Sequence, residues 1–320
     1  MRFLLQLAAL ALGALVANAP ARAEAYPDKP IQLIVPFAAG GSVDFIARQL
    51  ALQLQKDFPK GVVVVNRAGA SATIGTRAIA TAAPDGYTIG LINIAHVSNP
   101  ALGPVPYDPI KDFAPIALAT RIPSMLIVHQ SFPANTVKEL IDMAKAKPGA
   151  LSYGSVGLGT SNHLPMELLL NMTGAKMLHV PYSSTGGLNA DLLGGQVPIG
   201  FTTVPTGVAR IKTGKVKALG VASPKRLAVL PNVPAIAETV PGFEFADWNA
   251  VVAPAGTPPE IVARLHEEVI KAMHAPEFRQ RMDEFGAEVV GSTPQQLGEF
   301  LHAELAKWDR VIREAGITKH

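Results

Sequence analysis

One stretch near the start of the chain, Ile31–Asp44, limits the fold more than any other. Ile31–Val35 is a short apolar run rich in β-branched residues, which is typical of a buried strand in a parallel sheet. Pro36 ends the strand because it has no backbone N–H to donate, Gly40–Gly41 permit backbone angles that side chains forbid, and Ser42 is predicted to cap a helix. A strand, a glycine loop and a helix N-terminus in this order direct unpaired N–H groups at one point and favour an anion there. A tight strand-to-helix turn without a ligand would show the same pattern.

The first 23 residues have the pattern of a secretory signal peptide. Arg2 precedes an apolar run from Phe3 to Val16, and Ala21–Ala23 supplies the small residues that flank a cleavage site. An uncleaved membrane anchor is the alternative, but the run is short for a membrane span. We therefore expect cleavage near Ala23 and export of a soluble protein.

Composition limits the partners and the chemistry of the mature chain. Removing 23 residues from 320 leaves 297, which is long for one hydrophobic core, so two domains are expected. Without Arg2 and Arg22 the chain has 26 basic and 25 acidic residues, so the basic pI indicates neither a nucleic-acid nor a membrane partner. No cysteine is present, which excludes thiol chemistry, disulfides and thiolate metal sites.

Strand and helix patterns alternate through the first third of the chain. Further strands are expected at 62–65 and 87–94, with a helix of small residues at about 72–82 between them. Residues 95–100 close the third strand with polar groups at its carboxyl end, where open α/β sheets place ligands. His96 in this segment is weighed as a ligand contact and, more readily, as a structural histidine.

The alternation restarts in the middle of the chain, which predicts a second domain of similar build. Strands are expected at 114–119 and 125–129, and the break at 121–123 between them is the candidate for the first crossing between domains. Both halves therefore predict the α/β class, each with a mostly parallel sheet flanked by helices. The predicted bounds are 1–23 for the signal peptide, 24–122 and 254–320 for domain I, and 123–253 for domain II.

Two later loops have the same strand-loop-helix arrangement as the first one. Gly154–Ser161 and Tyr182–Gly187 each follow a predicted strand and precede a predicted helix, and both are rich in Gly, Ser and Thr. None of the three loops contains Lys or Arg. A small anion is therefore expected to be held by backbone N–H groups, hydroxyls and helix dipoles rather than by an ion pair.

The sequence lacks the residues that three common enzyme motifs require. Ser155 lacks the preceding glycine of a G-x-S-x-G elbow, no Gly-Lys-Ser/Thr phosphate loop occurs, and the glycines at 154–159 match a dinucleotide loop only loosely. His163 and Glu167 are spaced to bind a metal ion on one helix face, but no other ligand cluster lies nearby. We expect no cofactor, no metal and no catalytic residue.

The motifs together resemble the Bug-type substrate-binding proteins of tripartite tricarboxylate transporters. The resemblance covers essentially the whole mature chain in the family's order. It is carried by Tyr26–Pro30 followed by Val35–Asp44, by Gly159–His163, Val180–Tyr182, Asp191–Val197 and Ala253–Pro258, and by Lys307-Trp308 with Ala315-Gly316.

This resemblance implies a type-II-like, two-domain periplasmic binding protein that closes on a small carboxylate and delivers it to a membrane permease. In such proteins the ligand carboxylate is held largely by the first loop and by ordered waters. The chain departs from the family pattern at Ser183 and Ser184, where lysine or glycine is frequent, and at Pro198 and Thr202, where aspartates are frequent. Because an aspartate at position 202 could receive an amino group, its replacement weakens the case for an amino-acid ligand.

The resulting hypothesis is a periplasmic, monomeric receptor for a small organic carboxylate, with integral-membrane permease subunits as partners. A sensor subunit of a signalling system is the alternative, and an enzyme acting on a small carboxylate is a third. The residues expected to contact the ligand are Phe37, Ala38, Gly40, Gly41, Ser42, Asp44, His96, Ser155, Gly159, Thr160, Ser161, His163, Tyr182, Thr185, Gly186 and Thr202.

Overall fold

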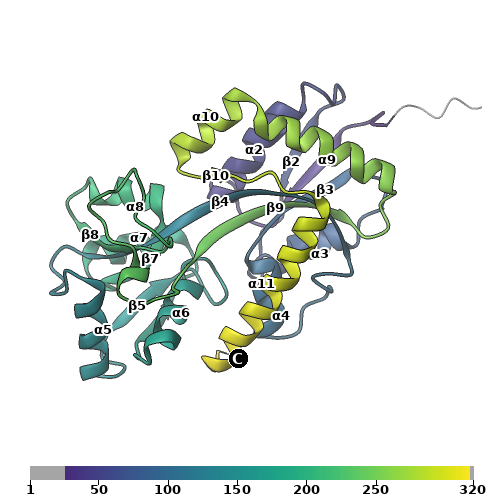
Figure 1. Ribbon diagram of the computed structural model, residues 1–320. Helices are drawn as coiled ribbons and strands as arrows, with labels where there is room; N and C mark the ends of the chain where they lie inside the picture. Colours follow the sequence, from purple (N-terminus) through teal and green to yellow (C-terminus); the bar gives the residue numbers. More distant parts are fainter. Residues whose placement is uncertain (1–25, 318–320) are drawn as a thin grey trace, which may run out of the picture.

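The computed structural model describes residues 26–317, which form two lobes joined by two long neighbouring strands (Figure 1). The predicted signal peptide and its cleavage site lie outside the described residues. The strands are β1 (Ile31–Val35), β2 (Val62–Asn66), β3 (Thr88–Asn93), β4 (Phe113–His129), β5 (Ser152–Ser155), β6 (Leu178–Pro181), β7 (Ile199–Thr203), β8 (Val216–Val221), β9 (Ala246–Pro254) and β10 (Glu288–Val289).

Hydrogen bonds between neighbouring strands give the spatial order β2-β1-β3-β9-β4-β7-β5-β6. Strands β10 and β8 each pair with β4 in addition. The pairs β1–β2, β1–β3, β5–β6 and β5–β7 are parallel. Every pair that involves β4 or β9 is antiparallel. The predicted α/β class is confirmed, and the sheets are mixed rather than mostly parallel because the two joining strands run against their neighbours.

Helices cover the sheets of both lobes. Within residues 26–317 they are α2 (Ser42–Leu54), α3 (Thr73–Ala80), α4 (Ala95–Leu102), α5 (Val137–Ala146), α6 (Leu164–Thr173), α7 (Thr185–Gly194), α8 (Val204–Ile211), α9 (Pro259–His274), α10 (Pro276–Phe285) and α11 (Pro294–Glu314), and a 3-10 turn is formed by Ile236–Glu238. Side-chain caps set several of the helix starts. The Thr136 hydroxyl accepts from the Glu139 amide at α5, and Thr293 with Gln296 forms a capping box at α11.

Strand β4 crosses from one lobe to the other without interruption. The sequence predicted two strands with a break at 121–123, and that prediction is wrong because β4 runs unbroken over Phe113–His129. Its residues 113–123 pair with β9, and its residues 124–129 pair with β7 and β8. We call the part built on β1, β2, β3, β9 and β10 the first lobe and the part built on β5, β6, β7 and β8 the second lobe. The domain bounds given above stay a prediction.

Two helices had no counterpart among the elements expected from the sequence. Residues 95–102 form α4, because Asn93 ends β3 by accepting the Ala95 amide at 3.0 Å and the chain turns directly into the helix. Helix α8 was not predicted at all. Its signals were present, since Pro205 stands in its first turn and Val204, Val208 and Ile211 recur at helical spacing.

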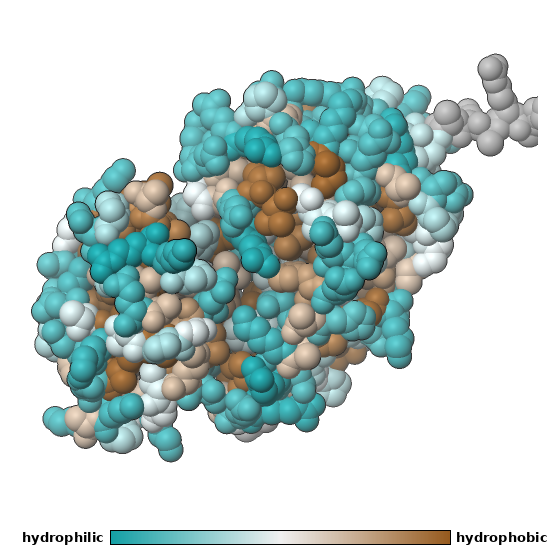
Figure 2. Space-filling model, viewed as in Figure 1, coloured by the Kyte–Doolittle hydropathy of each residue, from teal (hydrophilic) through white to brown (hydrophobic). Residues whose placement is uncertain are grey.

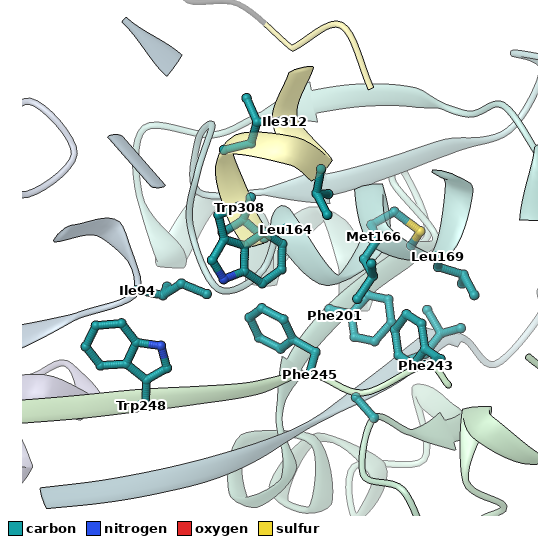
Figure 3. Close-up of a cluster of buried hydrophobic side chains, with 14 of the residues drawn as sticks. Ile94, Leu164, Met166, Leu169, Phe201, Phe243, Phe245, Trp248, Trp308 and Ile312 are labelled. Carbon is teal, nitrogen blue, oxygen red and sulfur yellow. The ribbon is translucent and has the colours of Figure 1, made fainter. Parts of the chain in front are cut away.

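One apolar cluster is continuous across both lobes. It contains Leu164 of α6, Phe201 of β7, Phe245, Trp248 of β9 and Trp308 of α11 (Figure 3). Helix α11 contacts α4 and β4 as well as α6, so it supports the strands where they pass from lobe to lobe. The indole N–H groups of both tryptophans donate to the same Glu304 carboxylate oxygen, at 3.0 and 2.9 Å.

The surface in the view of Figure 2 is mostly hydrophilic, with hydrophobic residues in small groups over both lobes. Large apolar side chains that reach solvent include Leu178 and Val229. Among residues 26–317, no helix combines the length and the apolar character that a membrane crossing requires.

Candidate ligand-binding cavity between the lobes

A cavity of about 600 Å³ lies between the two lobes, a size suited to a small organic molecule. Both lobes contribute to its wall. The first lobe supplies the loop after β1, the end of β3 and the start of β9, and the second supplies the loops before α6 and α7 together with α8. The lining residues are Phe37, Ala38, Ala39, Gly40, Gly41, Ser42, Val43, Asn93, Ala95, Val156, Thr160, Ser161, Asn162, Ser183, Ser184, Thr185, Leu188, Thr202, Thr203, Thr206, Arg210 and Asp247.

The loop after β1 brings the N-terminus of α2 to the cavity wall. Gly40 has a φ of +82°, a left-handed conformation that favours glycine. Gly41 is the N-cap of α2 and Ser42 its first residue, so the prediction that Ser42 caps the helix is wrong. No side chain caps this end of α2. Because the end lies in the cavity wall, the positive end of the helix dipole there favours a negatively charged group.

Asp44 holds this loop in place from behind the cavity and does not line it. Its carboxylate is buried and accepts from the Gly40 amide at 2.9 Å, from Arg48 Nε at 3.0 Å and from Asn66 Nδ2 at 2.9 Å. Asn66 also donates to the Phe37 carbonyl at 3.1 Å. Burial works against the charged form, but the hydrogen bonds from Arg48, Gly40 and Asn66 outweigh it and lower the pKa of Asp44. Asp44 therefore positions the loop.

Replacing Asp44 by asparagine is expected to lower the free energy of unfolding by about 1–2 kcal/mol at neutral pH, because charge-assisted hydrogen bonds are lost. A folded-state pKa below the unfolded value means that this contribution is present above pH ~4 and is lost as the pH falls through the depressed pKa. Urea unfolding at about pH 7 and pH 3 checks this, and the deficit of the variant should be smaller at the lower pH. Asp142→Asn, at an exposed carboxylate, is the control. An equal deficit at both pH values would contradict the assignment.

The loop before α6 contributes Thr160 and Ser161 to the cavity lining. The other predicted residues of this loop, Ser155 and Gly159, do not line the cavity. Thr160 Oγ1 donates to the Gly157 carbonyl at 2.7 Å, which holds the loop closed on itself. The carbonyl of Gly159 accepts from Ser98 Oγ of α4 at 3.0 Å. Ser155 Oγ lies 2.7 Å from His179 Nε2 and is buried away from the cavity.

The loop before α7 presents its hydroxyls and turns its tyrosine away. Ser184 caps α7 by accepting the amide three residues on at 3.3 Å, and Thr185 begins the helix. The Tyr182 hydroxyl donates to Asp191 at 2.7 Å and takes no part in the lining, and neither does Gly186. A second helix N-terminus therefore meets the cavity from the opposite lobe.

Both predicted histidines are buried and lie outside the cavity lining. His96 is buried between Tyr107 and Phe113, and its Nε2–H donates to the Pro109 carbonyl at 2.7 Å. Burial lowers its pKa to about 4. His163 is buried with its ring 4.4 Å from that of His179, and burial followed by this neighbour lowers its pKa to about 3. Within residues 26–317 no cluster of three or more His, Cys, Asp or Glu side chains is arranged to hold a metal ion.

Replacing His96 by glutamine is expected to make stability less sensitive to acid. The folded pKa of about 4 lies below the unfolded value of about 6.5, so the unfolded chain binds the proton more readily and wild-type stability falls from pH ~6.5 down to pH ~4. This contribution reaches roughly 2 kcal/mol at about pH 5. Urea unfolding at about pH 7.5 and pH 5 should show a loss that is smaller by this amount in His96→Gln and unchanged in His274→Gln, an exposed control. Equal acid losses in wild type and His96→Gln would refute this account.

Two charged residues of the cavity wall, Arg210 and Asp247, were not among the residues predicted from the sequence. Arg210 lies on α8, and its guanidinium donates to the Asn189 side-chain carbonyl. Asp247 lies at the start of β9, is only 2 % exposed, and accepts the Trp248 amide at 3.0 Å. Arg210 belongs to the cavity lining although none of the three loops contains a basic residue, so the expectation that the anion is held without a basic side chain stays a prediction.

Burial changes the ionisation of both residues. It lowers the pKa of Arg210, which still carries its charge at neutral pH. It also raises the pKa of Asp247 to about 6, against the opposing hydrogen bonds from the Ser161 hydroxyl and the Trp248 amide. The cavity can therefore hold a small anion through two helix N-termini, several hydroxyls and one guanidinium.

The predicted site residues divide into two groups, and whether they contact a ligand stays a prediction. Those that line the cavity are Phe37, Ala38, Gly40, Gly41, Ser42, Thr160, Ser161, Thr185 and Thr202. Those that lie outside its lining are Asp44, His96, Ser155, Gly159, His163, Tyr182 and Gly186.

Comparisons with known proteins agree on one family. The family model described as tripartite tricarboxylate transporter family receptor matches residues 46–317. The chain is 38% identical to a UPF0065 protein of Pseudomonas sp. strain P51, over 92% of this chain and 88% of that protein. It is 36% identical to protein BugT of Bordetella pertussis, over 93% of each chain.

Solved structures give the same result. The periplasmic binding protein BugD superimposes with a TM-score of 0.82 at 36% identity, covering 92% of this chain and all of BugD. Rpa4515 of R. palustris with adipate gives 0.83 at 35% identity, covering 91% and 98%. MatC of Rhodopseudomonas palustris with bound malate gives 0.81 at 31% identity, covering 90% and 100%. The chain therefore belongs to the family of tripartite tricarboxylate transporter receptors.

Proposed function

We propose that this protein is a periplasmic solute-binding protein that captures a small organic carboxylate and delivers it to the membrane permease of a tripartite tricarboxylate transporter. Family membership supports this role, and so do the relatives solved with adipate and with malate. The observation that carries the proposal is the cavity itself. Its wall combines the N-termini of α2 and α7, a group of Ser and Thr hydroxyls, and Arg210, which together favour an anion.

The ligand contacts in this proposal come from both lobes. The first lobe offers Phe37–Ser42 and the second offers Thr160, Ser161, Thr185 and Arg210. A ligand that touches both walls stabilises the closed arrangement of the lobes, because its contacts are complete only there. Closure is the feature that a permease partner would recognise.

A thermal-shift screen of the mature protein against small carboxylates tests the capture step, since a ligand that binds only the folded state raises the Tm. We expect at least one carboxylate to raise the Tm and its matched amide, which has no charge, to do so far less. Equal shifts with acid and amide would contradict an anion site.

Delivery to a permease has a separate test. Cells that lack this protein should lose uptake of the acid found in the screen and should regain it with the wild-type gene. Uptake that is unchanged in these cells would contradict the transport role and favour a sensor subunit. Conversion of the acid by the purified protein would favour an enzyme.

A further inference from the structure

The cavity contains two opposite charges that have no ionic partner. Asp247 accepts only from neutral groups, the Ser161 hydroxyl and the Trp248 amide. Arg210 donates to a neutral carbonyl on Asn189. In the part of the chain from residue 26 to residue 317, neither side chain forms an ion pair, with the other or with any further residue.

Buried charges without partners are costly in a folded protein, and they are usually paired or neutralised. Asp247 is almost fully buried, yet the hydrogen bonds that it accepts come from uncharged donors, the Ser161 hydroxyl and the Trp248 amide. Both charged side chains line the same space. A ligand that carries a negative and a positive group would satisfy both of them at once.

Resting on the function proposed above, we propose that the ligand is zwitterionic, an amino acid or a related amino carboxylate. The carboxylate that position 202 lacks is supplied to the same cavity wall by Asp247. Its ammonium group binds the Asp247 carboxylate, and its carboxylate is held by Arg210 and the N-terminus of α2. An ammonium group donates up to three hydrogen bonds and neutralises the buried carboxylate, whereas a second ligand carboxylate in its place would be repelled.

The ionisation of Asp247 separates this proposal from the opposite one, in which a protonated Asp247 donates to a second carboxylate of the ligand. The two groups that donate hydrogen bonds to Asp247, the Ser161 hydroxyl and the Trp248 amide, do not titrate in this range, and the other charged residue of the lining, Arg210, stays charged throughout. Binding of an ammonium needs the ionised form, so affinity falls as the pH drops through the pKa of about 6. Binding of a second carboxylate needs the protonated form, so affinity would rise.

The experiment begins with a thermal-shift screen of the common L-amino acids and of their deaminated counterparts, which keep the same carbon skeleton. Calorimetry then measures the Kd of the tightest amino acid and of its partner acid. We expect the amino acid to bind at least roughly tenfold tighter, as for a charge-assisted hydrogen bond. Asp247→Asn should abolish this preference, because it weakens binding of the amino acid relative to binding of the deaminated acid. Asparagine keeps the oxygen that accepts the Trp248 amide, and Asp142→Asn at an exposed position is the matched control.

A measurement on the wild-type protein does not depend on how the variant folds. Between about pH 7.5 and pH 5, where a neutral amino acid does not titrate, its affinity should fall about tenfold because Asp247 takes up a proton. An affinity that is flat or rises over this range would overturn the proposal. So would a preference for amino acids that survives in Asp247→Asn.

The screen also separates this inference from the function on which it rests. Deaminated acids that bind while amino acids do not would leave carboxylate capture intact and overturn the zwitterion. Failure of both sets while another small carboxylate binds would have the same meaning. Failure of every carboxylate tested, including those of the wider screen, would overturn carboxylate capture and this inference together.

Discussion

Replacing Trp308 by alanine is expected to lower the free energy of unfolding by about 3–5 kcal/mol, the range for truncating a fully buried tryptophan. The Trp308 side chain is completely buried and packs edge-on against Phe245 with ring centroids 5.6 Å apart (Figure 3). It also donates to Glu304 at 2.9 Å from a helix that contacts both lobes. Truncation leaves a cavity at the junction that the surrounding strands cannot fill. Urea unfolding followed by circular dichroism measures the loss.

Two variants show whether the lost packing is responsible. Trp308→Phe keeps most of the apolar volume and should cost clearly less, although it removes the hydrogen bond to Glu304. Leu178→Ala truncates a side chain that is 59% exposed and should change stability by less than about 0.5 kcal/mol. A Trp308→Ala protein as stable as wild type would mean that α11 contributes little to the junction.

Replacing Arg210 by glutamine is expected to weaken carboxylate binding by about 1.5–3 kcal/mol, roughly 10- to 150-fold in Kd. Arg210 is the cationic residue of the cavity wall, and its charge is not neutralised by an ion pair in residues 26–317. A ligand carboxylate would make charge-assisted hydrogen bonds to it in a partly desolvated site, where such bonds are strong. Glutamine keeps a donor but loses the charge. Calorimetry with the carboxylate found in the screen measures the change.

The matched control is Arg226→Gln, which removes a half-exposed arginine that pairs with Glu238 outside the cavity. This variant should bind the carboxylate with wild-type affinity. A folded Arg210→Gln protein with unchanged Kd would show that the ligand carboxylate is held by the helix N-termini and hydroxyls alone. That outcome would support the expectation drawn from the three loops.

The sequence by itself determined the class of the fold, the positions of most elements and the three loops at the cavity. The apolar run of β1, the glycines that follow it and the Thr136 cap of α5 are local signals. Each of them acts through neighbours a few residues away. The motif pattern also identified the family, and the match of the family model to residues 46–317 confirms that identification.

Local signals were weaker where contacts between distant segments decide the structure. The apparent break at residues 121–123 is part of β4, because β9 pairs with those residues from far along the chain and satisfies their hydrogen bonds. Asp44 and His96 lie in the right segments for a site, yet Asp44 turns inward to hold the loop and His96 is enclosed by Tyr107 and Phe113.

Only the tertiary structure decided which charged residues face the cavity. Arg210 stands in an amphipathic segment and Asp247 follows a long irregular connection, and in the sequence both resemble ordinary surface charges. They share one cavity because α8 of the second lobe and the start of β9 converge on it. The role of a charged side chain depends on how far burial removes it from solvent and on which groups surround it. Both are set here by segments that are remote in the chain.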